Sequence, residues 1–116
     1  MQNIHPEELA GWLAPGAVTP SAAVHAEAPP LLLDVREHWE FALCALPGSV
    51  HVPMREIPAR LGELDPSRPI VCICHHGRRS MQVAMFLEHR GYESVFNLSG
   101  GIDAWARQVD RAMATY

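Results

Sequence analysis

The chain has 116 residues, of which 48% are hydrophobic and 19% charged, and its formal net charge is −4. This size suits one domain with its own hydrophobic core, and the composition excludes a disordered chain. The negative balance argues against a nucleic-acid partner, and no stretch reaches the ~20 apolar residues of a membrane span. We therefore expect a single domain over residues 1–116. Three cysteines without a visible export signal indicate reduced thiols, so we expect this domain in the cytoplasm.

The first half of the chain predicts one buried strand between short helices. A proline and two acids near its start favour an N-terminal helix over about residues 6–13. A Pro- and Ala-rich loop follows, with a short edge strand expected at 22–24. The run at 31–35, which is apolar apart from Asp34, is typical of a strand buried on both faces. A short helix is expected within 36–46.

The second half repeats this alternation. A short strand near 50–52 and helical turns at 55–64 precede a second buried strand at 69–74, "PIVCIC". Apolar residues at 3–4 spacing then predict a helix that ends at Gly91, followed by a strand at 94–98 and a last helix. The alternation predicts an α/β domain with a central parallel sheet and helices on both faces. Ligands of such sheets bind outside the carboxyl ends of the strands, where Cys74 lies.

The loop after this strand carries donors and cations around a thiol. Its residues are His75, His76, Gly77, Arg78, Arg79 and Ser80. A loop that curls into a helix start turns backbone N–H groups toward one centre, and the helix terminus adds partial positive charge. Glycine permits backbone conformations that side chains forbid. Such surroundings favour a thiolate and would equally hold the terminal sulfur of a persulfide.

The other two cysteines have a plainer interpretation. Cys72 lies inside the predicted strand, and Cys44 lies on a predicted helix beside leucines. Buried cysteines usually behave as small hydrophobic residues, so both are assigned to the core. Cys74 alone has the environment of a reactive thiol.

Several separated motifs, in order, resemble the rhodanese homology domain. They are "LLLDVREHWEF", "LPGSVHVP", "IVCICHHGRRS" and "FLEHRGYESVFNLSGGIDAWA", within a core of about residues 31–107. The resemblance implies a rhodanese-like fold in which Cys74 carries sulfur as a persulfide and residues 75–80 form its cradle. By motif position, Asp34 and Arg36 would support the site structurally. The family usually has Gly-His-Ile before the Pro-Gly turn, where this chain has Cys-Ala-Leu at 44–46.

The resemblance also implies the reaction. We expect a sulfurtransferase that moves sulfane sulfur from thiosulfate, or another small anionic or persulfide donor, to a thiol, cyanide or a protein acceptor. Cys74 would be the catalytic residue, and residues 75–80 would bind the substrate. Two half-reactions imply ping-pong kinetics. Neither a cofactor nor a metal is expected.

Three alternatives remain. Cysteine-dependent phosphatases and arsenate reductases need C-x5-R, but the sixth residue after Cys74 is Ser80. The "CICHH" run offers zinc-type ligands, yet residues 72 and 74 share one extended strand and no second cluster is visible. A sulfur-relay or protein-binding module without turnover is the third alternative. The roles of His75 and His76 stay open between substrate donors and exposed residues.

Overall fold

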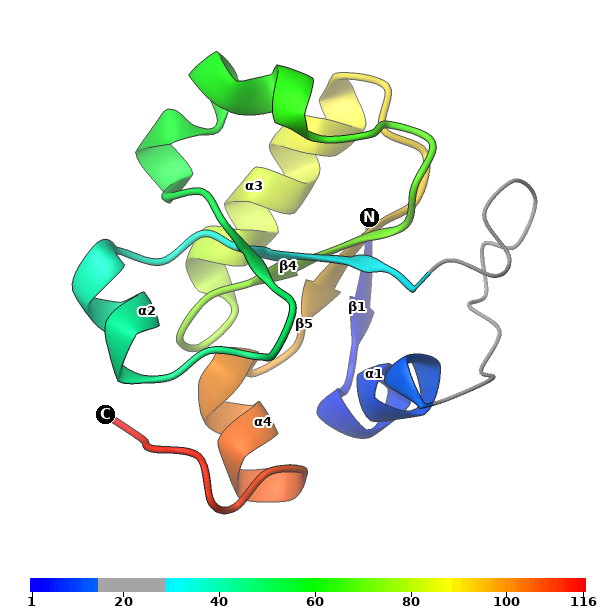
Figure 1. The fold of residues 1–116 in the computed structure, drawn as a ribbon. Coiled ribbons are helices and arrows are strands. Elements are labelled where there is room, and N and C mark those ends of the chain that lie inside the picture. The colour runs from blue at the N-terminus through cyan, green and yellow to red at the C-terminus, as the bar shows by residue number, and fades with distance from the viewer. Residues whose placement is uncertain (15–28) are drawn as a thin grey trace.

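The structure is a computed structural model that describes residues 1–14 and 29–116. Its centre is a parallel sheet of five strands in the order β1-β5-β4-β2-β3 (Figure 1). The strands are β1 (Gln2–Ile4), β2 (Leu31–Asp34), β3 (Val50–His51), β4 (Ile70–Ile73) and β5 (Val95–Leu98). The α-helices are α1 (Pro6–Leu13), α2 (His38–Leu43), α3 (Arg78–His89) and α4 (Gly101–Gln108). Two 3-10 segments, η1 (Met54–Glu56) and η2 (Pro58–Glu63), precede β4.

Strands β2 and β4 form the buried centre of the sheet. They pair in register from Leu31 opposite Ile70 to Asp34 opposite Ile73, and all their residues are buried. Successive side chains point to opposite faces of a strand. Thus Leu31 and Leu33 pack into one apolar cluster while Leu32 packs into the other. This explains why both strands are apolar in sequence except for Asp34 at the end of β2.

Helices cover both faces of the sheet. The cluster on one face includes side chains from α3 and Ile57, which lies between η1 and η2. The other cluster includes Leu9 of α1 and Trp105 of α4. Figure 1 shows α3 on one side of the strands and α1 and α4 on the other. The predicted α/β architecture is therefore confirmed.

The structure departs from the expected elements at β1, at the end of α2 and in the type of the helical turns at 55–64. Strand β1 was not predicted, because only one of its three residues is buried and so no apolar pattern marks it. Helix α2 ends one residue before Cys44, and the turns expected at 55–64 are 3-10 rather than α-helical. The edge strand expected at 22–24 falls outside the described residues.

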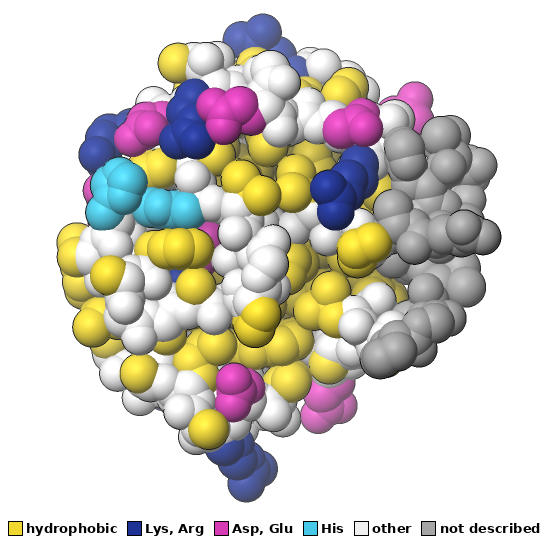
Figure 2. All heavy atoms as spheres, viewed as in Figure 1, with side chains coloured by type: hydrophobic (Ala, Val, Ile, Leu, Met, Phe, Trp, Pro, Cys, Tyr) yellow, Lys and Arg dark blue, Asp and Glu magenta, His cyan; other side chains and the backbone are white. Residues whose placement is uncertain are grey.

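Charged side chains of both signs are mixed on the face that Figure 2 shows. Arg55 pairs with Glu37, and Arg60 pairs with Glu56 and Glu63. Exposed pairs of this kind contribute little to stability, but they place positive and negative charges next to each other on this surface.

Within residues 1–14 and 29–116, none of the helices has the length and apolar character needed to cross a membrane.

Candidate functional site

Cys74 follows the last residue of β4, at the carboxyl end of the sheet, and its exposed fraction is 1%. Three residues separate it from Arg78, the first residue of α3. The N–H of Gly77 donates to the Cys74 Sγ over 3.0 Å. Gly77 has a φ of +100°, and a Cβ there would lie 3.2 Å from the carbonyl oxygen of Leu98. Only glycine fits both requirements, so this residue brings the backbone donor to the sulfur.

A second donor reaches the sulfur from the first turn of α3. The buried Ser80 Oγ lies 3.3 Å from the Cys74 Sγ and also hydrogen-bonds the Oδ1 of Asn97. A hydroxyl has one proton, so Ser80 donates to one of these acceptors at a time. It can therefore donate to a thiolate, or accept from a thiol while it donates to Asn97.

Asn97 of β5 is itself held in one orientation. Its Nδ2 donates to the carbonyl of Gly77 over 3.1 Å and to the Oδ1 of Asn3 over 2.9 Å. The Oδ1 of Asn97 must then face Ser80. This connects the unpredicted strand β1 to the loop that surrounds the sulfur. Asn97 and Asn3 were not predicted as site residues, because only strand pairing brings them there.

The start of α4 is joined to the same loop. The N–H of Ile102 donates to the carbonyl of Cys74 over 2.8 Å, and that of Asp103 donates to the carbonyl of His75 over 3.1 Å. Gly101 has a φ of +64°, and a Cβ there would lie 2.5 Å from the Cys74 carbonyl oxygen and closer still to that of His75. The second glycine of "SGG" is therefore required by this close approach.

The two loop arginines differ. Arg79 donates to both carboxylate oxygens of Glu40 on α2, over 2.7 and 2.8 Å. This pair, against the effect of burial, lowers the pKa of Glu40 to about 2. Arg78 is exposed and has no ion pair or side-chain hydrogen bond within the described part of the chain. The expectation that both arginines face an incoming anion therefore fits Arg78 better than Arg79.

Glu40 was not predicted as a site residue, although a weak signal was present. Its carboxylate accepts the N–H of Glu37 over 3.0 Å, as the third residue of a capping box at the start of α2. That pattern identifies a helix start, not a partner for a residue 39 positions away.

Asp34 and Arg36 form an ion pair whose side chains are both 0% exposed. Arg36 donates to Asp34 through its Nε and one terminal nitrogen, the shortest bond being 2.7 Å. It also donates to the carbonyls of Glu40 and Cys44, over 3.2 and 2.6 Å. Burial of two charges is favourable only when such partners are complete. The pair therefore joins the end of β2 to α2 and the turn after it.

Tyr116 reaches the same region from the segment after α4. Its ring stacks on His75 with a centroid separation of 3.9 Å and an angle of 10°. Its hydroxyl donates to Glu40 over 2.8 Å and accepts from Arg36 over 3.0 Å. Burial raises the pKa of Tyr116 to about 12, so the phenol stays protonated. Nothing in the sequence of residues 107–116 had assigned this segment to the site.

The two loop histidines lie together but in different environments. Their rings stack with a centroid separation of 3.9 Å. His75 lies between His76 and Tyr116, and its burial, with a smaller effect of His76, lowers its pKa. His75 is therefore neutral at neutral pH and adds no positive charge. His76 is exposed, and its Nε2 lies 3.8 Å from the Asp103 carboxylate.

The remaining cysteines lie apart from these donors. Cys72 is 0% exposed in the core, where burial raises its pKa strongly, so it stays a thiol. Cys44 is partly buried just beyond α2, and its carbonyl accepts from Arg36. Among the three thiols, Cys74 alone has both a backbone and a hydroxyl donor on its sulfur. This arrangement can stabilise negative charge on sulfur.

The model of the family described as "Rhodanese-like domain" matches residues 20–108. Over 77 residues the chain is 43% identical to a protein named "Sulfurtransferase" from Allochromatium vinosum, covering 66% of this chain and 72% of that protein. Over 89 residues it is 39% identical to the "Rhodanese-like/PpiC domain-containing protein 12, chloroplastic" of Arabidopsis thaliana, covering 73% of this chain. The match spans only 30% of that longer protein.

A solved structure has the same architecture. The crystal structure of a rhodanese-like domain protein from Staphylococcus aureus is 26% identical to this chain and superposes with a TM-score of 0.75. The alignment covers 100% of this chain and 99% of that one. The five-stranded fold described above is thus shared with a domain of the same family.

Proposed function

This chain belongs to the rhodanese-like domain family, and we propose on that basis that it is a sulfurtransferase whose Cys74 carries the transferred sulfur. The observation that carries the proposal is the pair of donors on the Cys74 Sγ, from Gly77 and Ser80, at the start of α3. The relative named "Sulfurtransferase" supports the reaction class. An unpaired cysteine in the core would need no such donors.

The reaction proceeds in two half-reactions. The Cys74 thiolate attacks the outer sulfur of an anionic donor, for which thiosulfate is the model. The new bond joins the Cys74 sulfur to the outer sulfur, and the bond inside the donor breaks, so that sulfite leaves with the bonding electron pair. A thiolate, cyanide or a protein acceptor then attacks the outer sulfur of the persulfide and restores Cys74. The two steps give ping-pong kinetics.

The loop residues divide these tasks. The N–H of Gly77 and the hydroxyl of Ser80 stabilise the sulfur anion before attack and after the acceptor has left. Arg78, which has no ion pair among residues 1–14 and 29–116, attracts the donor and the departing sulfite. Arg79, bound by Glu40, positions the first turn of α3 instead. Neutral His75 and exposed His76 belong to the sulfur-binding loop, residues 75–80, and can donate to an oxyanion.

The spacing of the loop supports sulfur rather than phosphate as the transferred group. A phosphatase of the C-x5-R type needs an arginine six residues after its cysteine. In this chain Ser80 occupies that position, is buried, and contacts Cys74 and Asn97. A relay module without small-molecule turnover would use the same persulfide, so it differs only in the acceptor.

The three unpaired cysteines support a reducing compartment, the cytoplasm.

The decisive experiment is the intact mass of the protein after incubation with thiosulfate, compared with Cys74→Ala and Cys72→Ala. We expect a gain of one sulfur atom in the wild type and in Cys72→Ala, reversed by cyanide, and no gain in Cys74→Ala. A gain only with glutathione persulfide would keep the mechanism and change the donor. If neither donor adds sulfur to a folded wild type, the proposal is wrong.

A further inference from the structure

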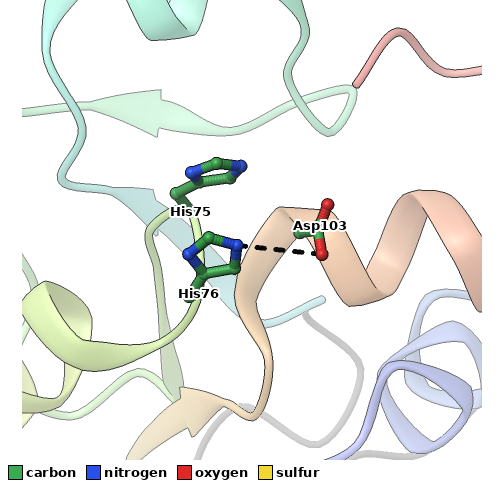
Figure 3. A group of neighbouring side chains, drawn as sticks. All are labelled: His75, His76 and Asp103. Carbon is green, nitrogen blue, oxygen red and sulfur yellow. Dashed lines mark ion pairs between the residues drawn. The ribbon is translucent and has the colours of Figure 1, made fainter. Parts of the chain in front are cut away.

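Beside the sulfur-binding loop, three potential metal ligands converge. His75 and His76 come from the loop and Asp103 from the first turn of α4 (Figure 3). One ligand atom from each side chain lies within 4.8 Å of the other two. Figure 3 shows both imidazoles beside each other, each with a ring nitrogen on the side of Asp103. None of the three contacts the Cys74 sulfur through its side chain, so the group is distinct from the donors described above.

One imidazole nitrogen of His75 lacks a partner. The Nε2 of His75 is buried and makes no hydrogen bond, and it is the sole buried side-chain nitrogen or oxygen of the described residues in that condition. Leaving a buried polar atom unpaired is unfavourable, and such atoms in native structures usually indicate a ligand, a water or a strained site. A metal ion would give this nitrogen a partner.

The backbone holds the three residues in place. The N–H of Asp103 donates directly to the carbonyl of His75, and the adjacent N–H of Ile102 donates to that of Cys74. Gly101 permits this close approach of α4 to the loop. The ring of Tyr116 stacks on the His75 imidazole and limits its rotation. Only His76, whose side chain is 64% exposed, is free to turn toward an ion.

We propose that His75, His76 and Asp103 bind one divalent transition-metal ion of the Zn²⁺ class. Two imidazoles and one carboxylate are ligands that Zn²⁺ accepts, and three protein ligands leave a fourth position open. Binding requires neutral imidazoles and an ionised carboxylate. The ligand atoms need to close by a small movement of His76 to reach the ~2 Å bonds of such a site.

Arg107 opposes this binding and offers a test of it. Its guanidinium lies 3.2 Å from the Asp103 Oδ2, one helical turn along α4, and its side chain is 73% exposed. A cation next to the carboxylate repels a metal ion and occupies one of its oxygens. Removing Arg107 should therefore strengthen metal binding, which is the opposite of what loss of a ligand does.

The experiment is a titration with Co²⁺ and Zn²⁺, carried out in the Cys74→Ala background so that the reactive thiol takes no part. We expect one Co²⁺ per chain with the ligand-field absorption of a nitrogen- and oxygen-bound ion, displaced by Zn²⁺. His76→Ala and Asp103→Asn should each weaken binding about 10-fold or more, while Arg107→Gln should tighten it. His89→Ala changes the histidine at the C-terminal end of α3, far along the chain from the three ligands, and is the matched control. It should bind the metal ion as tightly as the Cys74→Ala variant does.

The contrary results are equally defined. Binding that is unchanged by both His76→Ala and Asp103→Asn would overturn the proposal, as would the absence of stoichiometric binding. A sulfur-to-cobalt charge-transfer band would assign the ion to Cys44 or Cys72 instead. Because the parent variant lacks Cys74, none of these outcomes depends on sulfur transfer.

Discussion

Glu40 and Arg79, which are 39 residues apart in the chain, form a two-bond ion pair that fastens α2 to the first turn of α3. The Glu40 side chain is only 4% exposed, whereas that of Arg79 is 36% exposed. The N–H of Glu37 and the hydroxyl of Tyr116 add two further hydrogen bonds to the same carboxylate. The pair thus connects two helices at the loop that follows Cys74.

This ion pair should make stability depend on pH in the acid range. The pKa of Glu40 falls from 4.5 to about 2, so the folded protein keeps this carboxylate charged where the unfolded chain would protonate it. The stabilisation is complete above pH 4.5 and is lost as pH falls through 2, and it amounts to about 3 kcal/mol. Urea unfolding of Glu40→Gln should lack this part of the pH dependence. Glu63→Gln, at an exposed pair, is the control and should change the profile far less. Identical profiles for Glu40→Gln and wild type would contradict the prediction.

Ser80→Ala removes the hydroxyl donor from the Cys74 sulfur and leaves the Oδ1 of Asn97 without a partner. A hydrogen bond to a charged group contributes roughly 1.5–3 kcal/mol, so the rate of thiosulfate-dependent persulfide formation should fall by about tenfold or more. The rate is followed by rapid-quench mass spectrometry of the intact protein. Ser67→Ala changes a serine before β4, away from the loop, and should react at the wild-type rate. An unchanged rate in Ser80→Ala would show that Gly77 alone is a sufficient donor.

Gly101→Ala should disrupt the contact between α4 and the loop. The new Cβ would lie 2.5 Å from the Cys74 carbonyl oxygen, and the residue would also be forced to keep a positive φ. Strain of this kind costs of the order of 1–3 kcal/mol, in addition to the lost close approach. Gly62→Ala, where nothing lies within 4 Å of the added Cβ, is the matched control. Thermal unfolding should show a clear loss for Gly101→Ala and little change for Gly62→Ala.

Tyr116→Phe separates the two ways in which this residue contacts the site. The variant keeps the stacked ring on His75 but loses the hydroxyl that bridges Arg36 and Glu40. We expect a loss of about 1–2 kcal/mol in the free energy of unfolding, and a larger loss for Tyr116→Ala, which removes the ring as well. Chemical denaturation of the three proteins measures both steps. Equal stability of Tyr116→Phe and wild type would mean that the bridge is replaced by water.

Local sequence carried the information for most elements. The runs at 31–35 and 69–74 are apolar, apart from Asp34, because both faces of β2 and β4 are covered, and that pattern is visible without a structure. The loop of Cys74 was equally visible, since a thiol followed by a glycine, two arginines and a helix start has the local surroundings that favour a thiolate. In contrast, β1 is three residues long with one buried side chain, too little for any periodic signal.

The two loop arginines also differ in a way that the local sequence does not show. As sequence, Arg78 and Arg79 are alike, and both were expected to attract an anion. Glu40 distinguishes them, because the fold places its carboxylate beside Arg79 alone. Asn97 lies against Ser80 because β5 pairs with β4, and Asn3 reaches Asn97 through the pairing of β1 with β5.

The class of fold was thus predictable from the amino-acid sequence, and so was the place of Cys74 between a buried strand and a glycine loop, since strand burial, helix starts and glycine turns all depend on neighbours within a few residues. The groups that complete the site became known from the folded chain alone: Glu40 on Arg79, Asn97 on Ser80, Tyr116 on His75, and Asp103 beside both histidines. The physical reason is distance along the chain. Hydrogen bonds and ring contacts between residues tens of positions apart form only after the sheet has brought their elements together, and they leave no local pattern in the sequence.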